Sequence, residues 1–134
     1  MKFTNVFKFL FIVLAVVIGF SMTGCDLYEE ELDELVGFWE GTYYDGGGMT
    51  LDVYKERNNY KAVFSFSWPG SANGSYRMNV TYTGGEYVLK YEQWITNPYG
   101  WVSVDFKGKL NGNVFSGDIY HTGKLDGKFS VVRK

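Results

Sequence analysis

Hydrophobic and polar residues alternate along most of the chain after Leu35. Met49, Leu51 and Val53, for example, are separated by single residues that are more polar. An alternation of period two is typical of a β-strand with one buried face, whereas an amphipathic helix repeats every three to four residues. Eight segments show the alternation: 37–44, 49–55, 60–68, 75–82, 87–95, 101–110, 114–120 and 128–133. The pattern therefore predicts eight short strands.

The links between these segments are short and rich in turn residues, including four Asn-Gly or Asp-Gly pairs. Short links join antiparallel neighbours, because a parallel crossover needs about a dozen residues or more. Closure of eight strands removes both exposed edges of the sheet. We therefore predict an all-β domain, an eight-stranded antiparallel up-and-down barrel, over residues 36–134. A transmembrane barrel is excluded because charged residues fall on its outer face: Asp52, Lys61, Arg77, Lys90 and Asp105.

The first 25 residues follow a different pattern. A basic start with Lys2 and Lys8 precedes an unbroken apolar run over residues 9–20, and Thr23-Gly24-Cys25 follows. This order is typical of a helical secretory signal. Its end resembles the lipobox of bacterial lipoproteins, a family in which the cysteine is acylated and becomes the mature N-terminus. An uncleaved anchor helix with a buried thiol is the alternative.

The lipobox resemblance divides the chain into three parts. Residues 1–24 are the expected lipoprotein signal peptide, and residues 25–35 are the lipidated Cys25 with a tether that carries six acidic residues. Residues 36–134 form the barrel domain. The resemblance implies a protein that a lipid anchors to a membrane of the bacterial cell envelope, with its domain outside the cytoplasm. Inner membrane, outer membrane and cell surface remain open.

Two motifs within the predicted barrel resemble known families. Gly37-Phe38-Trp39 opens the first strand and Arg133 ends the last, which resembles the calycins (lipocalins, fatty-acid-binding proteins and avidins). That resemblance implies a barrel-closing pair, Trp39 under Arg133; an arginine solvated beside the C-terminus is the alternative. Residues 94–100 are similar to an uncharacterised bacterial β-domain with a W-I-x-x-P-x-G turn, a family without established chemistry.

Composition excludes several function classes. The formal net charge is −2, so no basic excess indicates nucleic acid. One cysteine excludes a disulfide framework and a thiolate zinc cluster, and one histidine argues against any metal site or catalytic relay that needs two. The histidine, His121, lies in a glycine-rich stretch, and no spacing singles out a catalytic carboxylate pair among Glu40, Glu92, Asp105 and Asp118. We expect a protein that is not an enzyme and has no cofactor or metal.

Binding is the function that the sequence favours. An eight-stranded barrel is just wide enough to be filled by side chains or to hold one small ligand. The alternation places many large residues inside, which predicts a packed interior or a small pocket at one end. Our first hypothesis is a monomer that binds a small hydrophobic or glycan ligand in a cup lined by tyrosines: Tyr43, Tyr76, Tyr82 and Tyr91.

A second hypothesis is a protein-interaction or inhibitor module that acts on an envelope protein. Aromatic residues around the proline turn are expected on the outside, and exposed tryptophan and tyrosine are frequent interface anchors. The candidates for this interaction surface are Trp94, Tyr99 and Trp101. A structural lipoprotein without a ligand is the third interpretation.

Overall fold

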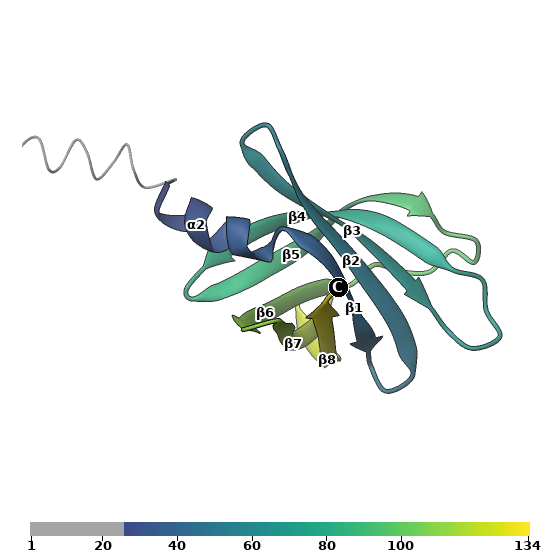
Figure 1. Cartoon of the computed structure of the whole chain (residues 1–134). Helices are drawn as coiled ribbons and strands as arrows, with labels where there is room; N and C mark the ends of the chain where they lie inside the picture. The colour runs from purple at the N-terminus through teal and green to yellow at the C-terminus, as the bar shows by residue number, and fades with distance from the viewer. Residues whose placement is uncertain (1–25) are drawn as a thin grey trace, which may run out of the picture. The chain divides into compact units, whose positions relative to one another are not determined.

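The computed structural model describes residues 26–134, and the predicted signal segment and Cys25 lie outside them. The described chain consists of a helix, α2 (Asp26–Leu35), and eight strands: β1 (Gly37–Tyr43), β2 (Gly47–Glu56), β3 (Asn59–Ser67), β4 (Gly74–Thr83), β5 (Glu86–Thr96), β6 (Asp105–Asn111), β7 (Val114–His121) and β8 (Lys124–Arg133). Each strand is antiparallel to the next, and β8 pairs with β1 to close the barrel (Figure 1). The predicted all-β closed barrel is therefore confirmed.

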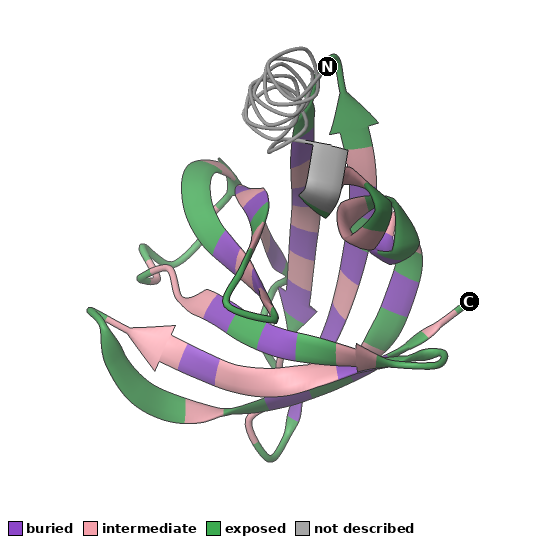
Figure 2. Ribbon diagram, turned by 90° about the vertical axis from the view of Figure 1, so that its left-hand side faces the viewer, coloured by how far each residue is buried: buried purple, intermediate pink, exposed green. Residues whose placement is uncertain are grey.

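The barrel and the last turn of α2 form one compact unit, Leu32–Lys134. Buried and more exposed residues alternate along its strands, as the predicted period of two requires (Figure 2). The interior is filled by aromatic rings in edge-to-face contact; the centroid of Phe64 lies 5.1 Å from that of Tyr76 and 4.9 Å from that of Phe106. Its middle is packed, not hollow.

Trp39 and Arg133 close the end of the barrel near the last turn of α2. They are partners in the register of β1 and β8, and the Arg133 guanidinium carbon lies 4.3 Å from the centroid of the fully buried Trp39 ring. The Trp39 indole donates to the Leu35 carbonyl at 2.9 Å, and Arg133 donates to the carbonyls of Val36, at 2.9 Å, and Glu34. This network joins the last turn of α2 to β1 and β8, the first and last strands of the sheet.

Two strands begin four residues away from the position that the sequence pattern predicts, and the other starts agree to within two residues. β6 begins at Asp105 instead of residue 101, because residues 101–104 have no strand partner. β8 begins at Lys124 instead of residue 128. A tight turn with positive φ at Thr122 (50°) and Gly123 (79°) extends the β7–β8 hairpin to the His121–Lys124 pair.

Irregular pairing of β5 changes the direction of its side chains. Met78 of β4 pairs with Tyr91, but the preceding residue Arg77 pairs with Gln93, so the bulge leaves Glu92 as an extra residue. One extra residue reverses the alternation that follows. Trp94 consequently points inward, where simple alternation had predicted it outside.

Among residues 26–134, no helix is long and apolar enough to span a membrane.

Candidate functional site

A cavity of about 490 Å³ lies at the end of the barrel opposite the last turn of α2. The β1–β2, β3–β4, β5–β6 and β7–β8 connections all reach this end, because consecutive strands alternate in direction. Most of the lining is aromatic, with a few polar side chains: Tyr43, Tyr44, Phe64, Phe66, Trp68, Ser71, Tyr76, Trp101, Val102, Val104, His121 and Asp126. A packed floor with an aromatic mouth is a frequent arrangement for small-molecule sites.

Two glycines make room for the tyrosine wall of the cavity. A Cβ at Gly47 would lie 2.3 Å from the Tyr43 ring, and a Cβ at Gly127 would lie 2.6 Å from the Tyr44 ring. Tyr44 itself has a φ of 55°, which is uncommon for a residue with a large side chain. The Trp68 ring completes the wall, with its centroid 5.4 Å from that of Tyr43. Local backbone strain and close packing thus position these rings together.

The hydroxyls of two lining tyrosines are held by other groups of the chain. The Tyr76 hydroxyl donates to the Val104 carbonyl at 2.7 Å and accepts from the Val104 amide at 2.9 Å. These bonds take the place of the missing strand pairing at residues 101–104. The Tyr44 hydroxyl donates to Oδ2 of Asp126, which fixes this carboxylate at the cavity wall.

The ionisation of the cavity tyrosines reflects their burial. Burial raises the pKa of Tyr43 to about 12, and a hydrogen bond from Trp68 opposes the shift. The pKa of Tyr44 is raised first by burial and then by the hydrogen bond to Asp126 and the charge of that residue. Burial also raises the pKa of Tyr76, against the effect of its hydrogen bond to Val104. All three rings are neutral phenols across the physiological range.

An alkaline titration tests this environment. A pKa above that of the unfolded chain gives stability that is complete below pH 10 and is lost as the pH rises. For Tyr43 the loss extends from pH 10 to about 12. We expect phenolate absorbance to appear in two phases and the melting temperature to fall across this window. In Tyr43→Phe the late phase should shrink; a single phase near pH 10 with unchanged melting would contradict the cavity geometry.

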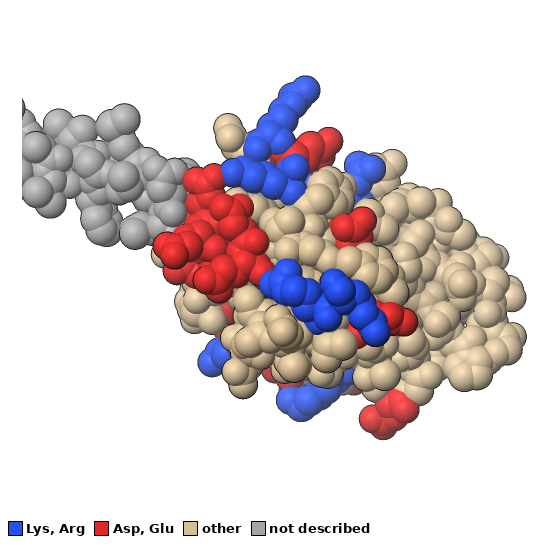
Figure 3. Space-filling view, in the orientation of Figure 1, with Lys and Arg blue, Asp and Glu red and all other residues tan. Residues whose placement is uncertain are grey.

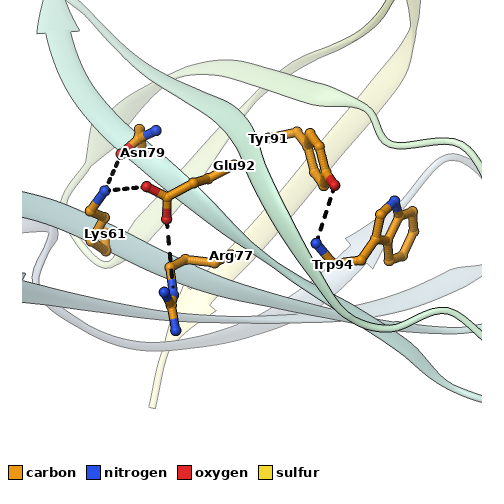
Figure 4. Close-up of polar contacts among 6 residues, drawn as sticks. All are labelled: Lys61, Arg77, Asn79, Tyr91, Glu92 and Trp94. Atoms are coloured by element: carbon orange, nitrogen blue, oxygen red, sulfur yellow. Dashed lines mark hydrogen bonds and ion pairs between the residues drawn. The ribbon is translucent and has the colours of Figure 1, made fainter.

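The four tyrosines of the predicted cup do not lie together. Tyr43 and Tyr76 line the cavity, but Tyr82 packs on Tyr87 (ring centroids 4.8 Å apart) near the β4–β5 hairpin at the other end. Tyr91 is 36% exposed and lies beside Tyr76 without lining the cavity. Its hydroxyl accepts a hydrogen bond from the Trp94 amide at 3.2 Å (Figure 4). The cup is thus confined to one end of the barrel.

Of the residues expected on the outer interaction surface, only Tyr99 is classed as exposed, at 59%. Trp94 packs inward after the bulge, and Trp101 lines the cavity with its ring centroid 4.9 Å from that of Phe66. The Asn97 side chain exchanges two hydrogen bonds, of 2.9 and 2.7 Å, with the Trp101 backbone and so fixes the turn that carries Trp101. The structure thus adds Trp101 to the cup and leaves Tyr99 at its rim.

Apart from Asp126, the Asp, Glu, Lys and Arg side chains of residues 26–134 lie outside the cavity lining. Glu92 contacts Lys61 at 2.5 Å and Arg77 at 4.0 Å on the outer face of β3–β5 (Figure 4). Asp118 pairs with Lys128 at 2.7 Å, Glu40 lies 3.5 Å from the Lys134 ammonium, and Asp105 accepts the Tyr91 amide at 2.9 Å. In the described part of the chain, no three His, Cys, Asp or Glu side chains are grouped to hold a metal ion.

The side chains Tyr44, Trp68 and Asp126 belong to the cavity but were not assigned to a cup from the sequence. Tyr44 follows Tyr43 in an alternating segment, so alternation alone places it on the outer face. The run of glycines after it, Gly46 to Gly48, was the available signal that the chain turns back there.

Comparison with protein families, with curated proteins and with solved structures finds no match for this chain.

Proposed function

We propose that this chain is a non-catalytic binding protein whose barrel takes one small ligand, hydrophobic or glycan, in the cavity at its open end. The observation that carries the proposal is the aromatic lining of a cavity of about 490 Å³. Ligand sites commonly span about 300–1,000 Å³ and combine apolar walls with a few polar groups. Ser71, His121 and Asp126 are the polar side chains other than tyrosine in this lining.

The exposure of the aromatic wall supports a ligand that stacks. Tyr44, Trp68 and Trp101 are half-buried, in contrast to the closed end, where Trp39 has no exposed area. Covering apolar surface yields about 25 cal/mol per Å², and aromatic faces also stack on sugars and flat ligands. A ligand in the cavity gains this contact without unpacking the core.

We further propose that the protein is an envelope lipoprotein of calycin-like fold. The basic, apolar and small-residue order of residues 1–25, with Cys25 at its end, supports lipidation. The acidic residues that follow are a spacer between anchor and barrel; Figure 3 shows them as a red patch on α2. The closed eight-stranded barrel, with Trp39 beneath Arg133, supports the calycin-like part of the proposal.

Binding of a neutral fluorescent probe, N-phenyl-1-naphthylamine, to the unit Leu32–Lys134 tests the cavity proposal. Trp68→Ala removes a half-buried ring from the wall and should weaken binding about tenfold or more, since aromatic contacts contribute about 1 kcal/mol beyond their burial. Tyr99→Ala is the matched control, because Tyr99 lies at the rim outside the lining. Equal affinities of both variants for the probe would refute the cavity as the site.

A protein-interaction or inhibitor module is the second candidate. Large apolar side chains are exposed on elements around the mouth: Ile95 at 53%, Tyr99 at 59%, Val102 at 69% and Leu125 at 62%. Exposed apolar groups of this kind are frequent in interfaces. This candidate predicts that Tyr99→Ala weakens partner capture more than Trp68→Ala does, the reverse of the order expected for a ligand in the cavity.

A further inference from the structure

The lining of the cavity carries charge of one sign. Among its twelve residues, Asp126 is the one carboxylate, and no lysine or arginine lines the cavity. Within residues 26–134, no cation lies within ion-pair distance of Asp126; Lys128, two positions along β8, is paired with Asp118 instead. Two of the four connections at this end, residues 68–74 and 97–104, contain no charged residue, whereas Asp45 lies in the β1–β2 turn and Lys124 begins β8; Figure 3 shows this end mostly tan.

Two tyrosine hydroxyls of the lining donate to other groups of the protein. The Tyr44 hydroxyl donates to Oδ2 of Asp126, and the Tyr76 hydroxyl donates to Val104. The second carboxylate oxygen of Asp126, Oδ1, accepts from no described group, so it can accept from a ligand. An anionic head group would be repelled by this carboxylate. A cationic head group would meet an exposed carboxylate that no lysine or arginine of residues 26–134 pairs.

The aromatic wall favours the same sign of ligand charge. The centroids of the Trp68 and Tyr44 rings lie 6.3 Å apart, and the two ring planes are inclined by 35°. Trp68 and Trp101 both line the cavity and are half-buried. Ring faces are negative, and a cation within about 6 Å of a ring centroid is attracted to them, most strongly by tryptophan. Alkyl groups on the cation add apolar contact with the same rings.

The ionisation of the tyrosines agrees with this reading. The charge of Asp126 raises the pKa of Tyr44, and the charge of Asp105 raises that of Tyr76, in each case after the larger effect of burial. No lysine or arginine lowers either pKa. A field that opposes a phenolate at these positions stabilises a positive charge there.

We propose that the ligand carries an alkylammonium group, which Asp126 neutralises while the faces of Trp68 and Trp101 contact the alkyl substituents. An uncharged apolar body occupies the remaining volume toward Phe64 and Phe66 at the floor. The inference deepens the proposed function and rests on it. The alkylammonium group belongs either to a free solute or to a lipid head group, which present the same chemistry.

Calorimetry on the full-length protein in phosphatidylglycerol nanodiscs, with empty discs as the blank, tests the proposal. The probes are choline and its neutral carbon isostere 3,3-dimethylbutan-1-ol, at about 0.15 M salt to screen distant charges. We expect choline to bind at least about tenfold more tightly than the alcohol. Asp126→Asn should lower the affinity for choline about five- to tenfold and leave the affinity for the alcohol unchanged, because the substitution removes the charge and keeps the shape of the side chain. Asp45→Asn, an exposed acid of the β1–β2 turn outside the lining, is the matched control and should bind choline as the wild type does.

The outcomes separate this inference from the function on which it rests. Equal affinities for choline and the alcohol, unchanged choline affinity in Asp126→Asn, or no heat with choline would each overturn the alkylammonium assignment. The cavity would still stand as a binding site if Trp68→Ala weakened binding of the neutral fluorescent probe. If it did not, the cavity proposal and the alkylammonium inference would both fall. If choline binds, competition by phosphatidylcholine discs indicates that the ligand is a lipid head group. If these discs have no effect on choline binding, the ligand is a free solute. Either result agrees with the proposal.

Discussion

Trp39→Ala is expected to destabilise the barrel by about 3–5 kcal/mol, the usual cost of removing a buried tryptophan. The Trp39 side chain has no exposed area and packs edge-on against Phe115, with ring centroids 6.2 Å apart. Its loss also leaves the Leu35 carbonyl without the indole donor and Arg133 without the ring beneath it. A domain of this size is commonly stable by about 5–15 kcal/mol, so the variant should be close to unfolding.

Urea unfolding of the unit Leu32–Lys134, followed by circular dichroism, measures this effect. The neighbouring Phe38→Ala is a suitable control, because Phe38 lies on the same strand, is 45% exposed and faces outward. We expect that control to lose about 1 kcal/mol or less, as surface substitutions usually do. A Trp39→Ala variant that unfolds at the same urea concentration as Phe38→Ala would show that the closed end does not depend on this ring.

Cys25→Ala is expected to abolish both lipid attachment and processing of the precursor. The thiol is the acceptor that the lipobox resemblance implies, and the chain has no other cysteine to replace it. Stable anchoring takes two or more acyl chains, because one myristoyl chain binds membranes with an association constant of only about 10⁴ M⁻¹. In a bacterial host fed radiolabelled palmitate, the wild type should be labelled and shortened, and the variant should be unlabelled and full-length.

Ser21→Ala provides the control for that experiment, since it changes a small residue in the same stretch and keeps the thiol. It should be labelled and processed as the wild type is. If Cys25→Ala were shortened, or carried label, to the same extent as Ser21→Ala, the lipoprotein assignment would fail, and the uncleaved anchor or ordinary secretion would replace it.

The fold follows from the sequence because alternation and turn residues are local signals. Met49, Leu51 and Val53 are buried as their spacing predicts, and short glycine-rich links leave few alternatives to an up-and-down barrel. The bulge in β5 is different. An extra residue at Glu92 depends on pairing with β4 and leaves no mark in the hydrophobic pattern, so the inward direction of Trp94 was not predictable.

The cavity was predictable only in part, because its residues come from strands that are far apart in the sequence. The hydrogen bond between Tyr44 and Asp126 joins positions 82 residues apart. Their contact depends on closure of β1 against β8 and on the strained φ of Tyr44, neither of which a single sequence reveals. Tyr43 and Tyr76 were found because an inward-facing tyrosine is visible from alternation alone, whereas Tyr82 shares that signal and lies at the other end.

The indole N–H signals of the tryptophans give the most direct test of the central claim, that the open end of the barrel is a binding site. Trp68 and Trp101 line the cavity, whereas Trp39 is buried at the opposite end. In a ¹H–¹⁵N spectrum of the unit Leu32–Lys134 titrated with N-phenyl-1-naphthylamine, the claim predicts saturable shifts of the Trp68 and Trp101 signals and an unmoved Trp39 signal. Shifts of equal size at all tryptophans, or saturation that leaves Trp68 and Trp101 unmoved, would contradict it.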